Sequence, residues 1–143
     1  MTEKTPFTPT IRTQADLEAA WRHLMEPLGF DGHSLWVMFI QADHTPLPHL
    51  TQVEETVDPP DAEQQASLVE FLGFFRGEMR GGERVAFLRS RPGRGGPGPD
   101  DLAWARSLYA ACRSAGVETD VVHLATDDQL VPLPMDDVLA QPA

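Results

Sequence analysis

Hydrophobic residues recur along the chain with two kinds of spacing, and each kind predicts a regular element. A first helix is predicted from Thr13, an N-cap hydroxyl that stands three residues before the carboxylate of Asp16. Apolar residues then recur at helical spacing until Pro27 and Gly29 end the run. The apolar residues of this helix are Leu17, Trp21, Leu24 and Leu28.

Short apolar runs predict the strands. Residues 34–41 are almost continuously apolar and rich in aromatic and β-branched types, which is typical of a strand buried on both faces. Residues 50–53 alternate weakly, and Pro46 and Pro48 place this second strand at a sheet edge. Residues 84–88 predict a third strand, also buried. Two more strands are predicted at residues 121–125 and 129–132, joined by a tight turn at Asp127 and Asp128.

Two further helices and one exposed loop complete the pattern. A long helix is predicted after residues 58–61, where an aspartate precedes two prolines. Residues 89–99 are dominated by glycine, proline and arginine and predict an exposed loop. The last helix opens at residues 100–101 and ends at Gly116. The apolar stripe of the long helix consists of Leu68, Val69, Phe71, Leu72, Phe75 and Met79, and Gly81 and Gly82 follow it.

This order of elements predicts an α/β fold with a single mixed sheet flanked by helices on both faces, in three layers. The length of 143 residues fits one domain, which we place at residues 13–133. Residues 1–12 are polar and contain proline, so we expect a flexible tail there. An acidic tail is expected at residues 134–143.

Composition and charge narrow the classes of function. Hydrophobic residues make up 41% of the chain and charged residues 23%, as in ordinary globular proteins. The net charge of −11 disfavours nucleic acid and anionic membranes as partners. The longest apolar run, residues 35–40, is too short to cross a membrane, and the first residues lack the core of a signal peptide. We therefore expect a cytoplasmic protein, and its single cysteine, Cys112, forms no internal disulfide.

Basic residues are concentrated in one segment of this acidic chain. Six of the 11 stand between positions 76 and 94, while the five histidines show no spacing typical of a zinc site. One interpretation is an anion-binding site made by Arg89, Arg91 and Arg94, ahead of a helix N-terminus. The other is a solvated loop with arginine–aspartate pairs, which are common and weak. The six residues are Arg76, Arg80, Arg84, Arg89, Arg91 and Arg94.

The order of elements resembles the JAB/MPN metalloprotease-like family, most closely its RadC-like bacterial branch. Residues 101–106, continuing through 116–117 to 130–133, resemble the final helix and strand pair of that branch. Residues 85–92 are similar to the strand that leads into the family's His-x-His-Pro loop. The resemblance covers about residues 13–133 and implies a three-layer, cytidine-deaminase-like architecture.

In that family, two histidines, an aspartate and a water hold zinc, and an upstream glutamate acts as general base. Here Arg89 and Arg91 stand at the histidine positions, and Asp101 matches the metal-binding aspartate. A guanidinium is cationic and offers no lone pair, so it cannot ligate zinc. The resemblance therefore implies a degenerate site without a metal cofactor, in which Arg91 and Arg89 pair with Asp101. Gly98 falls near the family's serine, and the glutamate position falls at Leu50 or Thr51, with Glu54 nearby.

These observations favour a non-catalytic protein, a bacterial pseudoenzyme that acts as a binding or scaffold module for an unknown protein partner. A first alternative is a module that binds an anion, phosphate or nucleic acid, through Arg89, Arg91 and Arg94. A second alternative is a hydrolase with a relocated metal site. That site would draw on His44, His49, Glu54 and Asp101. Large apolar side chains also favour a homodimer, among them Trp36, Phe74 and Trp104.

Overall fold

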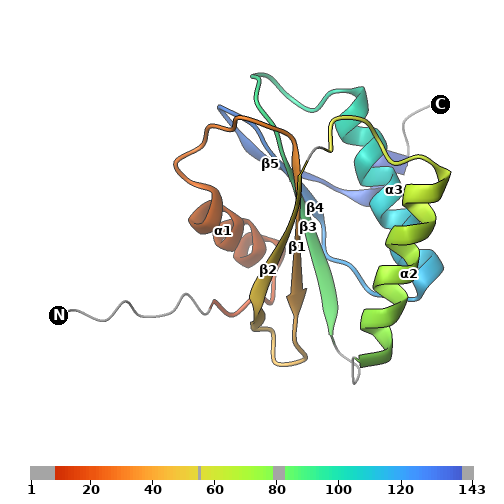
Figure 1. Cartoon of the computed structure of the whole chain (residues 1–143). Coiled ribbons are helices and arrows are strands. Elements are labelled where there is room, and N and C mark those ends of the chain that lie inside the picture. Colours follow the sequence, from red (N-terminus) through yellow and green to blue (C-terminus); the bar gives the residue numbers. More distant parts are fainter. Residues whose placement is uncertain (1–8, 55, 79–82, 140–143) are drawn as a thin grey trace.

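A computed structural model describes residues 9–54, 56–78 and 83–139 of the chain. In this part, four helices pack on one five-stranded sheet, with α1 on one face and α2 and α3 on the other (Figure 1). The predicted α/β class, a single mixed sheet between helices, is confirmed. The elements are α1 (Gln14–Met25), β1 (Ser34–Ile40), β2 (Pro46–Glu54), α2 (Ala62–Glu78), β3 (Arg84–Ser90), α3 (Pro99–Ala115), β4 (Val122–Ala125), β5 (Leu130–Leu133) and α4 (Met135–Leu139).

The sheet has the strand order β2-β1-β3-β4-β5. β3 and β4 run parallel, because α3 carries the chain back across the sheet between them, and the other neighbouring pairs are antiparallel. β1 is buried along nearly its whole length, as the apolar run at 34–41 predicted. β2 lies at an edge, as predicted, but begins at Pro46 rather than at Leu50. Prolines are tolerated there because an edge strand leaves one row of N–H groups without a partner strand.

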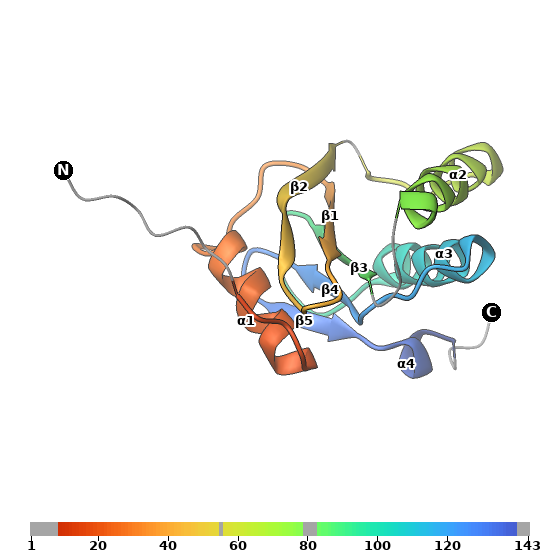
Figure 2. The same ribbon diagram turned by 90° about the horizontal axis from the view of Figure 1, so that it is seen from below.

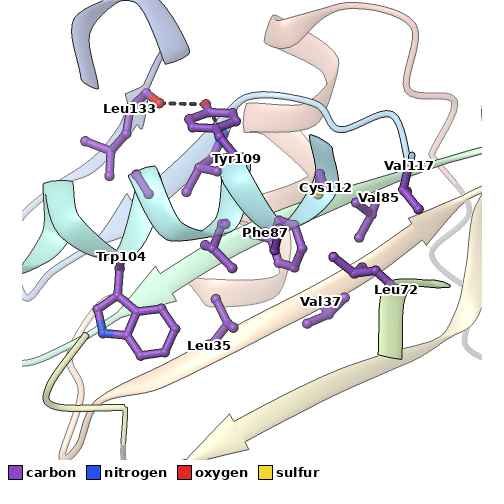
Figure 3. Packing of buried hydrophobic residues seen from close by; sticks show 14 of the residues in the cluster. Leu35, Val37, Leu72, Val85, Phe87, Trp104, Tyr109, Cys112, Val117 and Leu133 are labelled. Atoms are coloured by element: carbon purple, nitrogen blue, oxygen red, sulfur yellow. Dashed lines mark hydrogen bonds between the residues drawn. The ribbon is translucent and has the colours of Figure 1, made fainter. Parts of the chain in front are cut away.

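Two hydrophobic cores lie on the two faces of the sheet. Trp21 of α1 is fully buried, in a core that includes Met38 of β1 and Leu88 of β3. The larger core lies beneath α2 and α3 (Figure 3). In it the Tyr109 hydroxyl donates to the Leu133 carbonyl at 2.7 Å and accepts the Val122 N–H at 2.9 Å, so it ties α3 to β4 and to the end of β5. None of the described helices has the length and apolar character that a membrane-spanning segment requires.

Packed residues extend past the predicted domain limits of 13 and 133 at both ends. Ile11 is fully buried, its N–H donates to the His44 carbonyl at 2.7 Å, and its carbonyl accepts from Arg84, so packing begins inside the expected tail of residues 1–12. The expected acidic tail of residues 134–143 contains α4, beside α3 in Figure 2. Val138 of α4 is buried in the larger core, and burial of its apolar side chain holds this short helix against the domain.

Several predictions concern residues or side chains outside this description. Gly81 and Gly82, expected to end the long helix, lie outside the described residues, as do Met79 and Arg80. Of Arg76 and His49 only the backbone is described. Of the three apolar side chains expected to favour a homodimer, Trp104 is buried and Trp36 is partly buried, while Phe74 is 70% exposed.

Candidate functional site: a buried arginine–aspartate cluster

Four connections meet at one end of the sheet, around the end of β3 (Figure 1). They precede β1, follow β2, follow β3 and join β4 to β5. Asp127, in the last of these, accepts the N–H groups of Gly93 at 2.8 Å and of Phe30 at 3.0 Å, and these bonds lower the pKa of its carboxyl group. The Thr56 N–H donates to the His33 carbonyl at 3.1 Å. Loops that are far apart in sequence are therefore held together here.

Asp101, in the first turn of α3, lies at the centre of this region with only 2% of its side chain exposed. Its carboxylate accepts the Gly98 N–H at 2.8 Å, which caps the N-terminus of α3. It also accepts from the guanidinium groups of Arg89 and Arg91. Burial alone would raise the pKa of Asp101, but the hydrogen bonds from Arg91, Gly98 and Arg89 outweigh it and hold the pKa below its ordinary value.

Arg91 forms the closer ion pair with Asp101. Its Nη2 donates to Oδ2 at 2.7 Å and its Nε donates to Oδ1 at 2.8 Å, which is the bidentate arrangement that favours arginine over lysine. Its Nη1 donates to the Pro92 carbonyl at 3.0 Å, next to it in the chain. The hydrogen bonds to Asp101 raise the pKa of Arg91, so this side chain stays charged.

Arg89 is buried to the same extent as Asp101, and each of its N–H groups has an acceptor. Its Nε donates to Asp101 Oδ1 at 3.0 Å. Its Nη1 donates to the Thr56 carbonyl and, at 3.3 Å, to the Thr56 hydroxyl. Its Nη2 donates to His33 Nδ1 at 3.1 Å and to the Val57 carbonyl at 3.3 Å. A guanidinium has five N–H donors, so this environment satisfies all of them.

The pairing of Arg89 and Arg91 with Asp101, which the resemblance implied, is present in the structure. The prediction that residues 89–99 form an exposed loop is wrong at its start. Arg89 and Ser90 belong to β3 and are buried, since the acceptors around Arg89 compensate the cost of burying its charge. Arg94 is exposed in the loop, and no hydrogen bond joins it to Asp101 within the described part of the chain.

Two residues of the cluster, His33 and Thr56, carried no signal in the sequence. His33 was one of five scattered histidines, and its role depends on a contact with a residue 56 positions later. Because a guanidinium can only donate, His33 Nδ1 must be the acceptor, and the ring proton is on Nε2. Burial, together with the nearby charges of Arg89 and Arg91, lowers the pKa of His33, so this imidazole is neutral at pH 7.

The residues considered for a relocated metal site are separated. His44 lies beside Arg84 at the start of β3, with 3.3 Å between its Nδ1 and Arg84 Nη1, whereas Asp101 contacts Arg89 near the end of that strand. These two positions are about 16 Å apart along the strand, too far for one ion. Glu54 is exposed on β2. In residues 9–54, 56–78 and 83–139, no three histidine, cysteine, aspartate or glutamate side chains are grouped closely enough to hold a metal ion.

The chemistry of the cluster does not suit the zinc ion that members of the JAB/MPN family hold. Two guanidinium groups, from Arg89 and Arg91, occupy both sides of the Asp101 carboxylate, and their charge would repel a divalent cation. Comparison of the sequence with protein-family models and with curated proteins finds no match. The chemistry of the described residues is thus the basis for a functional proposal.

Proposed function

We propose that the chain is a non-catalytic, RadC-like protein of the JAB/MPN type that acts as a binding or scaffold module. In this proposal the Asp101 cluster replaces the family's metal centre. The single observation that carries the proposal is the placement of Arg89 and Arg91 on the two sides of Asp101, at the positions where the resemblance expects zinc-binding histidines. The helix and strand order of the domain supports the same relationship.

In this proposal, the hydrogen bonds of Arg89 hold together the chain segments that a metal ion would otherwise connect. A structural metal holds separate chain segments together through its ligands. Arg89 joins β3 to α3 through Asp101, to the connection after β2 through Thr56, and to the loop before β1 through His33. An ion pair of this kind provides no Lewis acid and no activated water, so it stabilises the fold without hydrolysing a peptide.

The geometry does not favour the alternative of an anion site on the arginine loop. All the N–H donors of Arg89 are used inside the protein, and Arg91 is paired with Asp101 on two atoms. Of the three arginines in that hypothesis, Arg94 alone is exposed. A single exposed guanidinium gives little affinity for phosphate in a chain with a net charge of −11.

The proposal is tested by measuring zinc after loading and desalting, by mass spectrometry of the full chain and of an Arg89→His/Arg91→His double variant. We expect no stoichiometric zinc in the natural chain. In the double variant, the two new imidazoles and Asp101 provide three ligands and leave a fourth position open. We therefore expect one zinc per chain in this variant and a zinc-dependent rise in its melting temperature.

An Arg89→Gln/Arg91→Gln variant is the matched control, because it removes the same two charges without adding ligands. Its melting temperature should not respond to zinc. If the histidine variant is unstable without zinc, the zinc-dependent rise in its melting temperature can still be measured, since metal binding contributes to folding. Stoichiometric zinc in the natural chain, or a histidine variant that behaves like the glutamine control, would overturn the proposal.

A further inference from the structure

A cavity of about 770 Å³ opens on the α1 side of the sheet, beside the arginine–aspartate cluster, with which it shares His33. It is formed by the loop before β1, the first part of β1 and the end of β2. A volume of this size is within the range of small-molecule sites. The side chains that give the cavity its chemistry are Phe30, His33, Ser34, Trp36, Gln52 and Glu54, joined by Asp31 and Ser90.

Trp36 provides a fixed aromatic wall. Its indole Nε1 donates to the Ser90 hydroxyl at 2.9 Å, which holds the ring in one orientation, and the ring also packs against the α1 core. Phe30 adds a second aromatic side chain to the lining. A tryptophan whose polar atom is already bonded presents its ring to a ligand as an apolar, electron-rich surface, which suits stacking with another flat ring.

Hydrogen-bond donors lie in the deeper part of the lining. His33 Nδ1 is occupied by Arg89, so the remaining polar group of the ring is the Nε2–H donor. The Ser34 oxygen accepts from Gln52 Nε2 at 3.0 Å, which leaves its own O–H to donate. The Ser90 oxygen likewise accepts from Trp36, which leaves the Ser90 O–H to donate. A ligand therefore needs an acceptor, such as a carbonyl or a ring nitrogen, on the edge that faces these groups.

Acceptors and negative charge lie at the exposed part of the lining. Asp31 and Glu54 are exposed carboxylates, and the amide oxygen of Gln52 is a further acceptor. The lining contains two carboxylates and neither lysine nor arginine. This distribution favours a ligand with N–H donors on its outer edge and disfavours one that carries a carboxylate or a phosphate.

We propose that the cavity binds a planar heteroaromatic ring with an amide or amino group, stacked on Trp36. In this arrangement the acceptors of the ligand face His33 and Ser34, and its N–H donors face Glu54 and Asp31. The inference goes beyond the proposed function, since it concerns a different face of the sheet. Its failure would leave the zinc measurement and the interpretation of Asp101 unchanged.

The experiment is a titration of the ¹⁵N-labelled full chain, followed by NMR, with two probes and their anionic counterparts. The probes are nicotinamide, a flat ring with an amide group, and adenosine, a flat ring with an amino group; the counterparts are nicotinate and adenosine monophosphate. We expect saturable shifts of the Trp36 indole N–H and of backbone signals of residues 29–36 and 52–54 with at least one probe. Its anionic counterpart should bind about 10-fold more weakly, which corresponds to about 1.4 kcal/mol.

Two variants decide which contacts matter. Glu54→Gln should weaken the affinity for the probe several-fold, because an acceptor for its N–H donors loses its charge. It should also reduce the preference of the protein for the probe over the anionic counterpart, because the carboxylate that repels anions is gone. Trp36→Leu should abolish saturable binding. Thr51→Ala is the matched control. Thr51 is exposed on β2, the strand that carries Glu54, but it pairs with Val37, whose side chain lies in the larger core, so Thr51 is on the face of the sheet away from the cavity.

The proposal is overturned if neither probe produces a saturable shift at these residues up to about 10 mM, the weak end of small-ligand affinity. It is also overturned if the anionic counterparts bind as well as the probes, or if Thr51→Ala weakens binding as much as Glu54→Gln does. Because Glu54 is exposed and its variant keeps the same size, the Glu54 comparison stays decisive even if Trp36→Leu disturbs the packing.

Discussion

Arg91 and Asp101 lie edge to edge, with Arg91 Nη2 at 2.7 Å from Asp101 Oδ2 and Arg91 Nε at 2.8 Å from Oδ1. Arg89 adds a second cation to the same carboxylate, at 3.0 Å from Oδ1. The cluster thus contains two positive charges and one negative charge. Asp101 compensates both guanidinium groups, so it is the member whose loss should cost most.

Asp101→Asn should lower the free energy of unfolding by about 3 kcal/mol, because it leaves two guanidinium groups without their carboxylate, one of them fully buried. For a chain of this size, that corresponds to a fall in melting temperature of roughly 10 °C. Thermal unfolding followed by circular dichroism measures the change. Asp100→Asn is the control, since Asp100 is the exposed neighbour on the same turn. Equal melting temperatures for the natural chain and Asp101→Asn would contradict the prediction.

Arg89→Lys should destabilise the protein more than Arg91→Lys. A lysine ammonium has three donors, so it cannot serve the five acceptors that surround Arg89. We expect a loss of about 2 kcal/mol for Arg89→Lys, from buried acceptors left without donors, and about 1 kcal/mol for Arg91→Lys. Hydrogen exchange provides a local readout, since the Thr56 amide should exchange faster in Arg89→Lys only. Similar exchange at Thr56 in both variants would argue against this assignment.

Stability should fall as the pH drops below about 6.5, because the unfolded chain then binds protons that the folded chain resists. His123 is fully buried, and burial lowers its pKa below its ordinary value of 6.5. Its Nδ1 lies 3.0 Å from the Val121 carbonyl, so Nδ1 carries the proton and Nε2 is bare and buried. Burial also lowers the pKa of His33. For both residues the folded pKa is depressed, so their contribution is fully present at pH 7.5 and declines toward pH 5.

Urea unfolding at pH 7.5, 6.5 and 5.5 measures this dependence. His123→Gln should make the decline between pH 7.5 and 5.5 shallower, because one proton-linked group is removed. A decline that is equally steep in the His123 variant would exclude His123 as its source.

Cys112 should be unreactive in the folded protein. The thiol is buried among the residues of the larger core, and desolvation raises its pKa to about 11. At pH 8 only about 0.1% of it would be thiolate, the form that reacts. We expect no reaction with a disulfide reagent over minutes at pH 8 and stoichiometric reaction in urea. Rapid labelling of the native chain would show that α3 opens far more readily than its packing suggests.

Much of the fold could be predicted because its signals are local. The cap at Thr13 and Asp16 forms as predicted, with each residue accepting from the backbone of the other. Gly116 ends α3 in the left-handed conformation that glycine favours. The start of packing at Ile11 could not be predicted in this way, since its partners, His44 and Arg84, are 33 and 73 positions later.

The candidate site also contains features that could be predicted from the sequence and features that could not. The Asp101 pairing was predicted through the family resemblance, which brought Arg89, Arg91 and Asp101 to one site. The burial of Arg89 was not, since it depends on acceptors from Thr56 and His33 that no spacing in the sequence connects. Glycine and proline after position 92 suggested exposure for the whole segment, whereas β3 continues through Ser90.

The long-range contacts of Arg89 also have a consequence for folding rates. Its partners stand between 12 and 56 positions away in the chain, so we expect these contacts to form late in folding. Contacts that form after the transition state affect the rate of unfolding and leave the rate of folding nearly unchanged. We therefore expect substitutions of Arg89 and Asp101 to speed unfolding more than they slow folding.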